Sequence, residues 1–417
     1  MPGVLHVRRC LTFACSTDSF LLFVRAVSAL RGPVQHTRTL SLEAVRPSIY
    51  TVLPPRWLHD ILVRFPRLRE LRVRDFPFFD DAALLSVQAL PQPHEGLLRL
   101  SAPASCNSTA GGLCELLRKL PRLQALDLSG CGGAGSPAVL RCIPSSVRAL
   151  SLRDLDLTDE VWRPAAKRLG LGVRSLDVRG NSLTDSSAQL LLDYSFAPPG
   201  YLSSFVMEEA GLTRLRIADN SLTVAGAIKL IMAARLVTLD LGTPLGDPAG
   251  LVPPLHVYAS RVLRTLRAPH GVVTAPNGLR RRLLPRLTTL VLCAVPEWME
   301  KRQAETLVRF VANTTENEGD CLQVLELEMV TQDAGGSVLD GEFSFFDGEQ
   351  EGGSSWAAAS APAAEERVET LKRLKKVRDA KAVGWQGSIR VVRDLGGRES
   401  HETGVEGERW SLVREGY

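Results

Sequence analysis

The sequence lacks the features that would point to a membrane protein or an enzyme. No apolar run approaches the roughly 18 residues that a membrane span requires. The seven histidines are scattered and form no HExxH motif, and no GxxxxGKS/T phosphate-binding pattern occurs. We therefore expect a protein that is not an enzyme, with no catalytic residues, no metal site, no cofactor and no membrane contact.

The sequence also lacks a large excess of charge of either sign, and its cysteines follow no recognised spacing. A formal net charge of +4 is small for 417 residues, so we expect no nucleic-acid partner. The eight cysteines form no CxxC pair and have no metal-ligand spacing with histidine. This pattern favours reduced thiols in an intracellular protein, in the cytoplasm or the nucleus.

The N-terminus allows three interpretations. Arg8 and Arg9 precede a mildly apolar stretch, which would suit a mitochondrial presequence, whereas Asp18 interrupts the apolar region of a secretory signal. We favour a capping helix over Ser19 to Leu30, begun by Ser16 to Asp18. Its predicted inner face carries Phe20, Phe23, Val27 and Leu30.

What the sequence has is a repeated unit, clearest in Val173 to Leu192. In the frame LxxLxLxxN, positions L1, L4 and L6 are Val173, Leu176 and Val178, and the alternation predicts a strand with these residues in the core. Asn181 can satisfy backbone groups of the neighbouring unit with its side-chain amide. Asp185 can then cap an apolar helix. One unit cannot bury its core face alone, so copies must stack.

The same frame recurs eleven times between residues 37 and 330. The spacing varies, and the longest step, of 39 residues, holds an insertion over residues 193 to 205. The predicted units begin at Thr37, Leu68, Leu97, Leu123, Val147, Val173, Leu212, Leu236, Leu263, Leu287 and Leu322. A helix longer than the others is expected from Trp298 to Asn313, within the last step.

After the repeats the composition changes. Residues 331–364 form a Gly/Ser/Ala-rich linker whose part from 333 holds six acids and no bases. A charged helix is expected from Glu365 to Ala382, with its basic residues between Lys372 and Lys381 at the end that the helix dipole favours. Two short strands are expected at Ile389 to Val392 and Trp410 to Val413. The predicted regions are therefore 1–36, 37–330, 331–364 and 365–417.

These units resemble the leucine-rich-repeat superfamily, in its ribonuclease-inhibitor-like and cysteine-containing subtypes. The segments Phe76 to Asp81 and Leu176 to Asp185 also look like uncharacterised intracellular repeat proteins of filamentous fungi. The resemblance implies an α/β fold: a right-handed solenoid with a parallel sheet on its concave face and helices on its convex face. It implies a recognition scaffold and no particular reaction.

In such strands, positions x3, x5 and x7 point away from the core onto the concave face. Around the longest step, the x5 column alternates in charge through Asp177, Arg216, Asp240 and Arg267. Either the column pairs with itself, or its arginines bind the carboxylate or phosphate of a partner. The candidate partner-binding residues are Arg72, Arg74, Arg99, Asp127, Arg153, Asp177, Arg179, Arg214, Arg216, Asp240 and Arg267.

Three local segments suggest other interpretations. Leu53 to Leu62 resembles the opening of an F-box, which would make the protein a ubiquitin-ligase adaptor, although a repeat helix with Trp57, Leu58, Ile61 and Leu62 inward fits as well. The acidic segment after the repeats is reminiscent of GTPase-activating repeat proteins. Gly130 to Gly135 lacks the lysine of a phosphate-binding loop and is predicted to be a turn. The favoured hypothesis is a monomeric scaffold that binds another protein.

Overall fold

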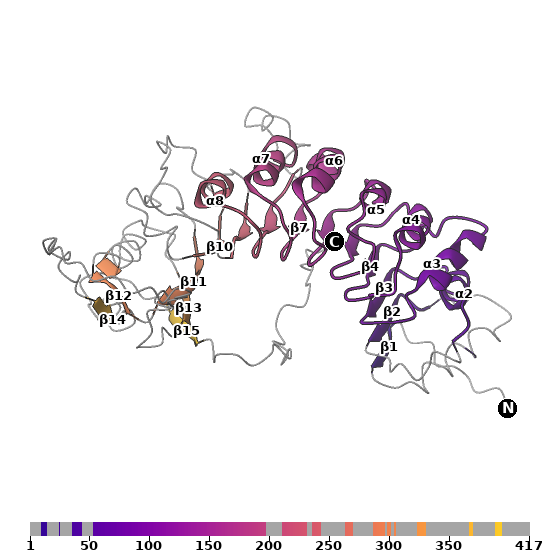
Figure 1. Cartoon of the computed structure of the whole chain (residues 1–417). Coiled ribbons are helices and arrows are strands. Elements are labelled where there is room, and N and C mark those ends of the chain that lie inside the picture. Colours follow the sequence, from indigo (N-terminus) through magenta and orange to yellow (C-terminus); the bar gives the residue numbers. More distant parts are fainter. Residues whose placement is uncertain are drawn as a thin grey trace, which may run out of the picture.

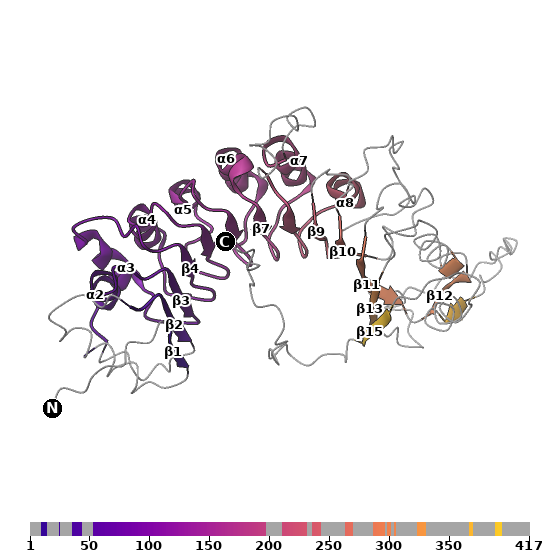
Figure 2. The same ribbon diagram turned by 180° about the vertical axis from the view of Figure 1, so that it is seen from behind.

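The computed structural model describes residues 10–14, 25, 36–43, 53–196, 211–231, 236–242, 263–269, 287–296, 298–301, 304–305, 323–330, 367–369 and 388–393. These residues form a curved solenoid, with strands along the inner side of the arch and helices along the outer side (Figure 1). The view from behind shows the same two layers (Figure 2). The fold is therefore an α/β solenoid with an open sheet.

A single parallel sheet of 13 strands forms the inner layer, and its strands follow one another in chain order, with β12 and β14 left out as a separate pair. Each short strand begins two residues after L1, so the register repeats from unit to unit. The strands are β1 Cys10–Ala14, β2 Thr39–Glu43, β3 Glu70–Arg74, β4 Arg99–Ser101, β5 Ala125–Asp127, β6 Ala149–Ser151, β7 Ser175–Asp177, β8 Arg214–Arg216, β9 Thr238–Asp240, β10 Thr265–Pro269, β11 Thr289–Pro296, β13 Val324–Val330 and β15 Ser388–Arg393.

Helices of six to eleven residues cover the outer side where the structure describes it. Several begin at a Thr, Ser or Asp whose side chain accepts a hydrogen bond from the first turn; in α4, for example, Thr109 accepts from the Gly112 N–H at 3.1 Å. The helices are α2 Trp57–Arg64, α3 Asp81–Ser86, α4 Ala110–Arg118, α5 Pro137–Cys142, α6 Asp159–Leu169, α7 Asp185–Tyr194 and α8 Val224–Ile231, with short 3-10 turns η2 Val87–Ala89 and η3 Gly170–Gly172.

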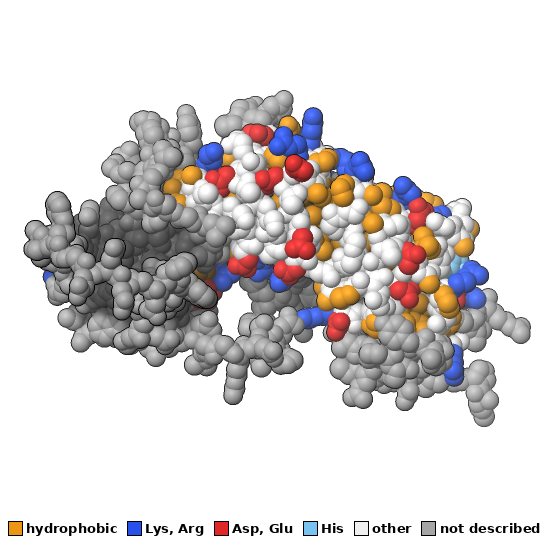
Figure 3. Space-filling model, viewed as in Figure 1, with side chains coloured by type: hydrophobic (Ala, Val, Ile, Leu, Met, Phe, Trp, Pro, Cys, Tyr) orange, Lys and Arg blue, Asp and Glu red, His pale blue; other side chains and the backbone are white. Residues whose placement is uncertain are grey.

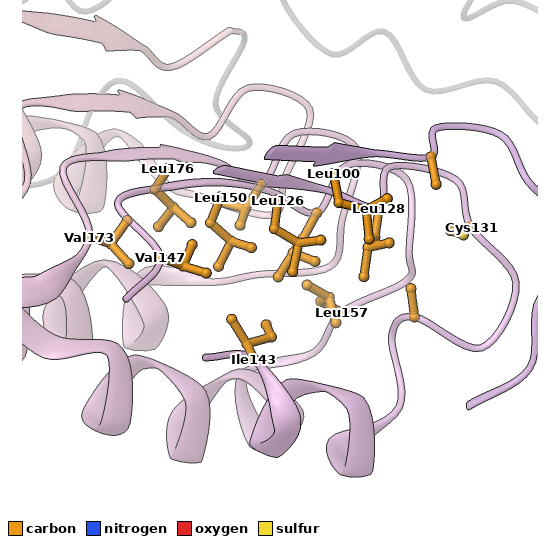
Figure 4. Close-up of a cluster of buried hydrophobic side chains, with 14 of the residues drawn as sticks. Leu100, Leu126, Leu128, Cys131, Ile143, Val147, Leu150, Leu157, Val173 and Leu176 are labelled. Atoms are coloured by element: carbon orange, nitrogen blue, oxygen red, sulfur yellow. The ribbon is translucent and has the colours of Figure 1, made fainter. Parts of the chain in front are cut away.

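The core lies between the two layers. Position L4 supplies a continuous row in which Leu100, Leu126, Leu150 and Leu176 stack on one another (Figure 4). Each of these four side chains is at most 2% exposed. Burying a leucine contributes roughly 1.5–3 kcal/mol, so the stacked row is the main source of cohesion between units.

Asparagine joins neighbouring units at the end of this row. The Asn181 Oδ1 atom accepts hydrogen bonds from the backbone N–H groups of Leu155 at 3.1 Å and Leu157 at 3.0 Å, and its Nδ2 atom donates to the Leu152 carbonyl at 2.9 Å. Asn220 repeats the arrangement one unit later, accepting from the Leu183 N–H at 3.0 Å. The predicted role of Asn181 is confirmed.

The eleven predicted units are confirmed as the strands β2 to β11 and β13. The frame across the 39-residue step is correct, because Asp177 pairs in register with Arg216. The segment that resembles an F-box is the repeat helix α2, and its four predicted inward residues are buried. The predicted turn at Gly130 to Gly135 is confirmed: Gly133 has φ of 70°, and a Cβ atom on it would lie 2.5 Å from the Ala110 nitrogen.

Both ends of the sheet differ from the sequence prediction. Strand β1 precedes the first predicted unit, with Leu11 in register with Leu40, and β15 follows the last one. Strand β15 includes the predicted strand Ile389 to Val392. The expected capping helix, apart from Arg25, and the expected strand Trp410 to Val413 lie outside the described residues.

Two predicted helices contain a strand near their first residue, although Lys301, Ala304 and Glu305 of the first one are helical as predicted. Residues Trp298–Glu300 form β12, which pairs antiparallel with β14, Arg367–Glu369. The prediction considered each segment alone, whereas strand propensity depends on the partner that a segment meets. The basic residues between Lys372 and Lys381 lie outside the described residues, so the boundaries of the C-terminal regions stay predictions.

Candidate functional site on the concave face

The x5 column forms one continuous row across the concave face. Its members are in register from strand to strand, as the repeat frame predicts. In order, they are Ser41, Arg72, Ser101, Asp127, Ser151, Asp177, Arg216, Asp240, Arg267, Val291 and Glu326. The sequence therefore places every rung of this column correctly.

Small hydroxyl side chains surround Asp127 near the middle of the row. Its carboxylate accepts from Ser101 Oγ at 3.2 Å and from Ser129 Oγ at 2.7 Å. Ser129 also hydrogen-bonds Ser151 Oγ at 2.8 Å. Because these hydroxyl groups satisfy the carboxylate, Asp127 helps to order the sheet surface here.

A paired charge cluster follows on β7 to β13, which we name the charge cluster: Asp177, Arg179, Arg216, Asp240, Arg267 and Glu328. Arg179 binds Asp177 through two hydrogen bonds, Nε to Oδ1 at 2.9 Å and Nη2 to Oδ2 at 2.8 Å. Its Nη1 atom also lies 3.7 Å from Asp240 Oδ2, although Asp240 is on β9 and Arg179 is next to β7. The guanidinium group thus reaches past β8.

Arg267 closes the other end of the charge cluster. Its Nη1 atom lies 3.4 Å from Asp240 Oδ1, and its Nη2 atom donates to both oxygens of Glu328, at 3.0 and 2.9 Å. Arg216 lies 3.9 Å from Asp177. In the space-filling view, blue and red side chains accordingly lie together on the underside of the arch (Figure 3).

Burial changes the protonation equilibria in this cluster. Asp177 is 3% exposed and Asp240 is 8% exposed. Burial raises the pKa of Asp240, and the guanidinium groups of Arg267 and Arg179 offset part of that effect. Burial alone would lower the pKa of Arg179, but its hydrogen bonds and charge interaction with Asp177 raise it. The cluster neutralises itself and holds its arginines charged.

The remaining candidate residues lie outside the charge cluster. Arg72 donates to Glu70 Oε1 on its own strand at 2.8 and 2.6 Å. Arg153 lies 3.7 Å from Asp154. Arg74, Arg99 and Arg214 are exposed. The structure thus gathers Asp177, Arg179, Arg216, Asp240 and Arg267 in one group and leaves the other candidates spread over β3 to β8.

Sequence reasoning left two features of the cluster out. Glu328, in the x7 column, was not among the candidates, yet it binds Arg267 across the intervening β11. The bridge from Arg179 to Asp240 was also missed. The available signal was side-chain size: the x7 positions of β8 and β9 are Ala218 and Gly242, which leave room for a long side chain from β7.

The described residues contain neither a metal-ligand group nor a membrane-spanning helix. No group of three His, Cys, Asp or Glu side chains in the described part of the chain could hold a metal ion. No helix within the same residues is long and apolar enough to cross a membrane.

Comparison with known proteins does not show a family for this chain. The sequence matches no protein-family model and no curated protein. A solved structure similar to it is the leucine-rich repeat-containing protein LegL7 from Legionella pneumophila, with 14% identity, a TM-score of 0.37, and coverage of 78% of this chain and 91% of that chain. The chain folds as a leucine-rich-repeat solenoid. The register of its thirteen parallel strands carries that conclusion.

Proposed function

We propose that this protein is a non-enzymatic scaffold that binds another protein on the concave face of its solenoid. The observation that carries the proposal is the x5 column, which presents a pre-ordered row of side chains across eleven strands in register, all of them polar except Val291. Stacked repeats create such extended surfaces, and a surface that is already ordered loses little entropy when a partner binds.

The middle of the face has room for a partner. Strands β4 to β7 carry mostly small side chains there, among them Ser101, Ala125, Ala149 and Ser175, while β3 and β8 carry arginines. A protruding partner segment can approach the backbone over the small residues and meet guanidinium groups on either side. Arginine is enriched at protein interfaces, which fits this arrangement.

The finer assignments stay predictions of this proposal. The cytoplasm or the nucleus is favoured, because the five cysteines whose side chains the structure describes are free thiols. The cysteine-containing subtype is supported by Cys131, which occupies the asparagine position of its unit, with Sγ 3.5 Å from the Ser105 carbonyl. A monomer is expected.

The test is capture of partners from a cell lysate by the wild type and by a blocked variant. Ala125→Tyr combined with Ser175→Tyr places two uncharged rings on the concave face. Ala82→Tyr combined with Ser186→Tyr is the matched control on the exposed helices α3 and α7. We expect the blocked variant to lose proteins that the control retains. A thermal melt checks that the blocked variant is folded. If the folded blocked variant captures the same proteins as the wild type, the proposal of binding on the concave face is wrong.

A further inference from the structure

A row of arginines runs across the sheet at the N-terminal ends of its strands. Each one is the first residue of a strand or the residue immediately before it, at position x3 or x2 of its unit. Because the strands are parallel and in register, these residues lie along a single edge. We name this set the arginine rim: Arg38, Arg69, Arg99, Arg148, Arg174, Arg214 and Arg264.

Four members of the arginine rim form no ion pair in the described part of the chain, in contrast to the arginines of the charge cluster on the same sheet. At the x2 and x3 positions of the described units the only acid is Glu70, which hydrogen-bonds Arg72. Arg38 and Arg148 donate to the backbone carbonyls of Arg67 and Gly172. Within the described residues, Arg69, Arg99, Arg214 and Arg264 make no side-chain hydrogen bond or ion pair, and all four are exposed.

A stabilising role does not account for this row. Adjacent parallel strands lie about 4.8 Å apart, so neighbouring guanidinium groups on this edge repel one another. Cations near helix C-termini are explained by the helix dipole and by hydrogen bonds to the last carbonyls, as with Arg168 and the Leu140 carbonyl at 3.1 Å. Within the arginine rim, Arg148 does reach such a carbonyl, that of Gly172 at the end of η3, at 2.8 Å. Arg69, Arg99, Arg214 and Arg264 donate to no carbonyl in the described part of the chain, so the charge of these four arginines is available to a ligand.

The chemistry of the row selects the kind of ligand. Guanidinium groups bind carboxylates and phosphates through paired hydrogen bonds. Proteins that hold single-stranded nucleic acid add aromatic side chains on which the bases stack. None of the x2 and x3 positions in the described units is aromatic. We propose that the arginine rim docks an acidic, extended segment of the partner protein.

The spacing sets the length of that segment. Six steps of about 4.8 Å separate β2 from β8, or roughly 29 Å, which an extended chain covers with about nine residues at 3.3 Å each. The strands between them contribute one rim arginine each, except β5. An acidic segment of this length would meet a guanidinium group at nearly every rung. This inference rests on the proposed function, because it assigns the chemistry of the protein partner.

The test uses a fluorescein-labelled peptide of alternating glutamate and serine, about 20 residues long, and the full chain. The rim variant carries Arg69→Gln, Arg99→Gln, Arg214→Gln and Arg264→Gln. Its matched control carries Arg141→Gln, Arg163→Gln, Lys167→Gln and Lys229→Gln, four exposed cations of the helices α5, α6 and α8. Both variants lose the same net charge and no described side-chain contact.

We expect the dissociation constant of the peptide, from fluorescence anisotropy, to rise roughly tenfold or more in the rim variant and less than about twofold in the control. Added salt should weaken wild-type binding more steeply than binding by the rim variant. The rim variant should melt no lower than the wild type, because its substitutions remove repulsion.

Equal losses in the two variants would mean that only net charge matters, and would overturn the proposal. So would tighter wild-type binding of a labelled oligouridine of similar length than of the peptide. The proposed function fails separately: in that case Ala125→Tyr with Ser175→Tyr does not change which proteins are captured from the lysate. If only the proposal for the arginine rim fails, these two substitutions still reduce that capture.

Discussion

At the scale of single residues, the units are joined by a polar contact that the leucine frame does not contain. An aspartate at the first position of one helix accepts from the threonine that caps the next helix. Asp185 accepts from the Thr223 N–H at 2.8 Å, and Asp159 accepts from the Thr184 N–H at 3.0 Å. Asp81 and Thr109 form the same pair. The first two contacts satisfy a backbone N–H at a helix N-terminus with a neighbour's carboxylate, and the third positions the capping hydroxyl of Thr109.

The packing of α4 against α3 leaves little room for a side chain at Gly112. A Cβ atom on Gly112 would lie 2.7 Å from Leu84 Cβ and 3.1 Å from Asp81 Oδ1, whereas one on Gly111 would meet nothing within 4 Å. We predict that Gly111→Ala stabilises the protein by roughly 0.5–1 kcal/mol through helix propensity, and that Gly112→Ala destabilises it. Urea denaturation of the two variants measures the change in the free energy of unfolding that each substitution causes. A stabilising Gly112→Ala would contradict the packing described.

A second residue-scale prediction concerns His94, which is buried between two units. Its Nδ1 atom accepts from the Leu97 N–H at 3.1 Å, and its Nε2 atom lies 3.1 Å from the Phe65 carbonyl. Burial lowers the pKa of His94, although its backbone hydrogen bonds oppose that effect. Below the ordinary histidine pKa of about 6.5, His94 is protonated in the unfolded chain but stays neutral in the folded chain. The free energy of unfolding therefore falls as the pH falls.

The measurement is the melting temperature between about pH 8 and pH 5 for the wild type and for His94→Gln. We expect the wild type to lose up to about 1.4 kcal/mol per pH unit more than the variant below the ordinary histidine pKa. Parallel pH profiles for the two proteins would show that His94 does not titrate as described.

At the scale of strands, the charge cluster couples elements that are not neighbours in the sheet. Arg267 on β10 holds Asp240 on β9 and Glu328 on β13, while Arg72 pairs with Glu70 on its own strand. We predict that Arg267→Gln costs roughly 1–3 kcal/mol, because Glu328 loses its cation and the nearly buried Asp240 loses the nearer of its two guanidinium partners. Arg72→Gln, in the same column but half exposed, should cost less than about 1 kcal/mol.

Denaturation of Arg267→Gln, Glu328→Gln and the double variant completes the comparison. A coupling free energy between Arg267 and Glu328 is expected, since the two side chains share two hydrogen bonds. Additive losses would mean that the pair does not form in solution, and that β10 and β13 are linked only through β11.

How far the sequence predicts these features depends on their period. The rungs of the x5 column follow from the alternation of L4 and L6, so Asp177, Arg216 and Asp240 could be aligned without a structure. The period does not give the bridge from Arg179 to Asp240, because the Arg179 side chain crosses to another strand; the small residue Ala218 on the intervening strand indicates only that there is room for it. The arginine rim was not predicted as a surface, because the repeat frame assigns only x3, x5 and x7 to the concave face and most rim arginines are at x2. Strands β1 and β15 lie outside the leucine frame.

At the scale of the whole molecule, the sheet is closed at its C-terminal end by a strand from beyond the acidic segment. Strand β15 pairs with β13, and β14 pairs with β12, although residues 331–364 separate them in the chain. Protease cleavage within residues 333–364, which the acidic Gly/Ser/Ala-rich sequence predicts, should therefore leave the two fragments associated.

Size-exclusion chromatography of the nicked protein checks this expectation. A chain ending at residue 340 is the matched comparison: it lacks β14 and β15, so the edge of β13 loses its hydrogen-bonded neighbour and the protein should melt lower and aggregate sooner. Resistance of residues 333–364 to cleavage would contradict the linker prediction. Separation of the nicked fragments without denaturant would contradict the pairing of β13 with β15.

The joints between helices are unequal, and this has a consequence for how such a chain changes over evolutionary time. Within residues 53–196, Asp–Thr pairs join α3 to α4 and α6 to α7, but none joins α5 to either neighbour. A solenoid has no closing contact, so duplication or loss of a whole unit changes only two joints. The α5 unit has no Asp–Thr pair to restore on either side, although Arg168 of α6 donates to its Leu140 carbonyl at 3.1 Å, so a recombined gene that changes this unit needs fewer matched helix caps to encode a folded protein.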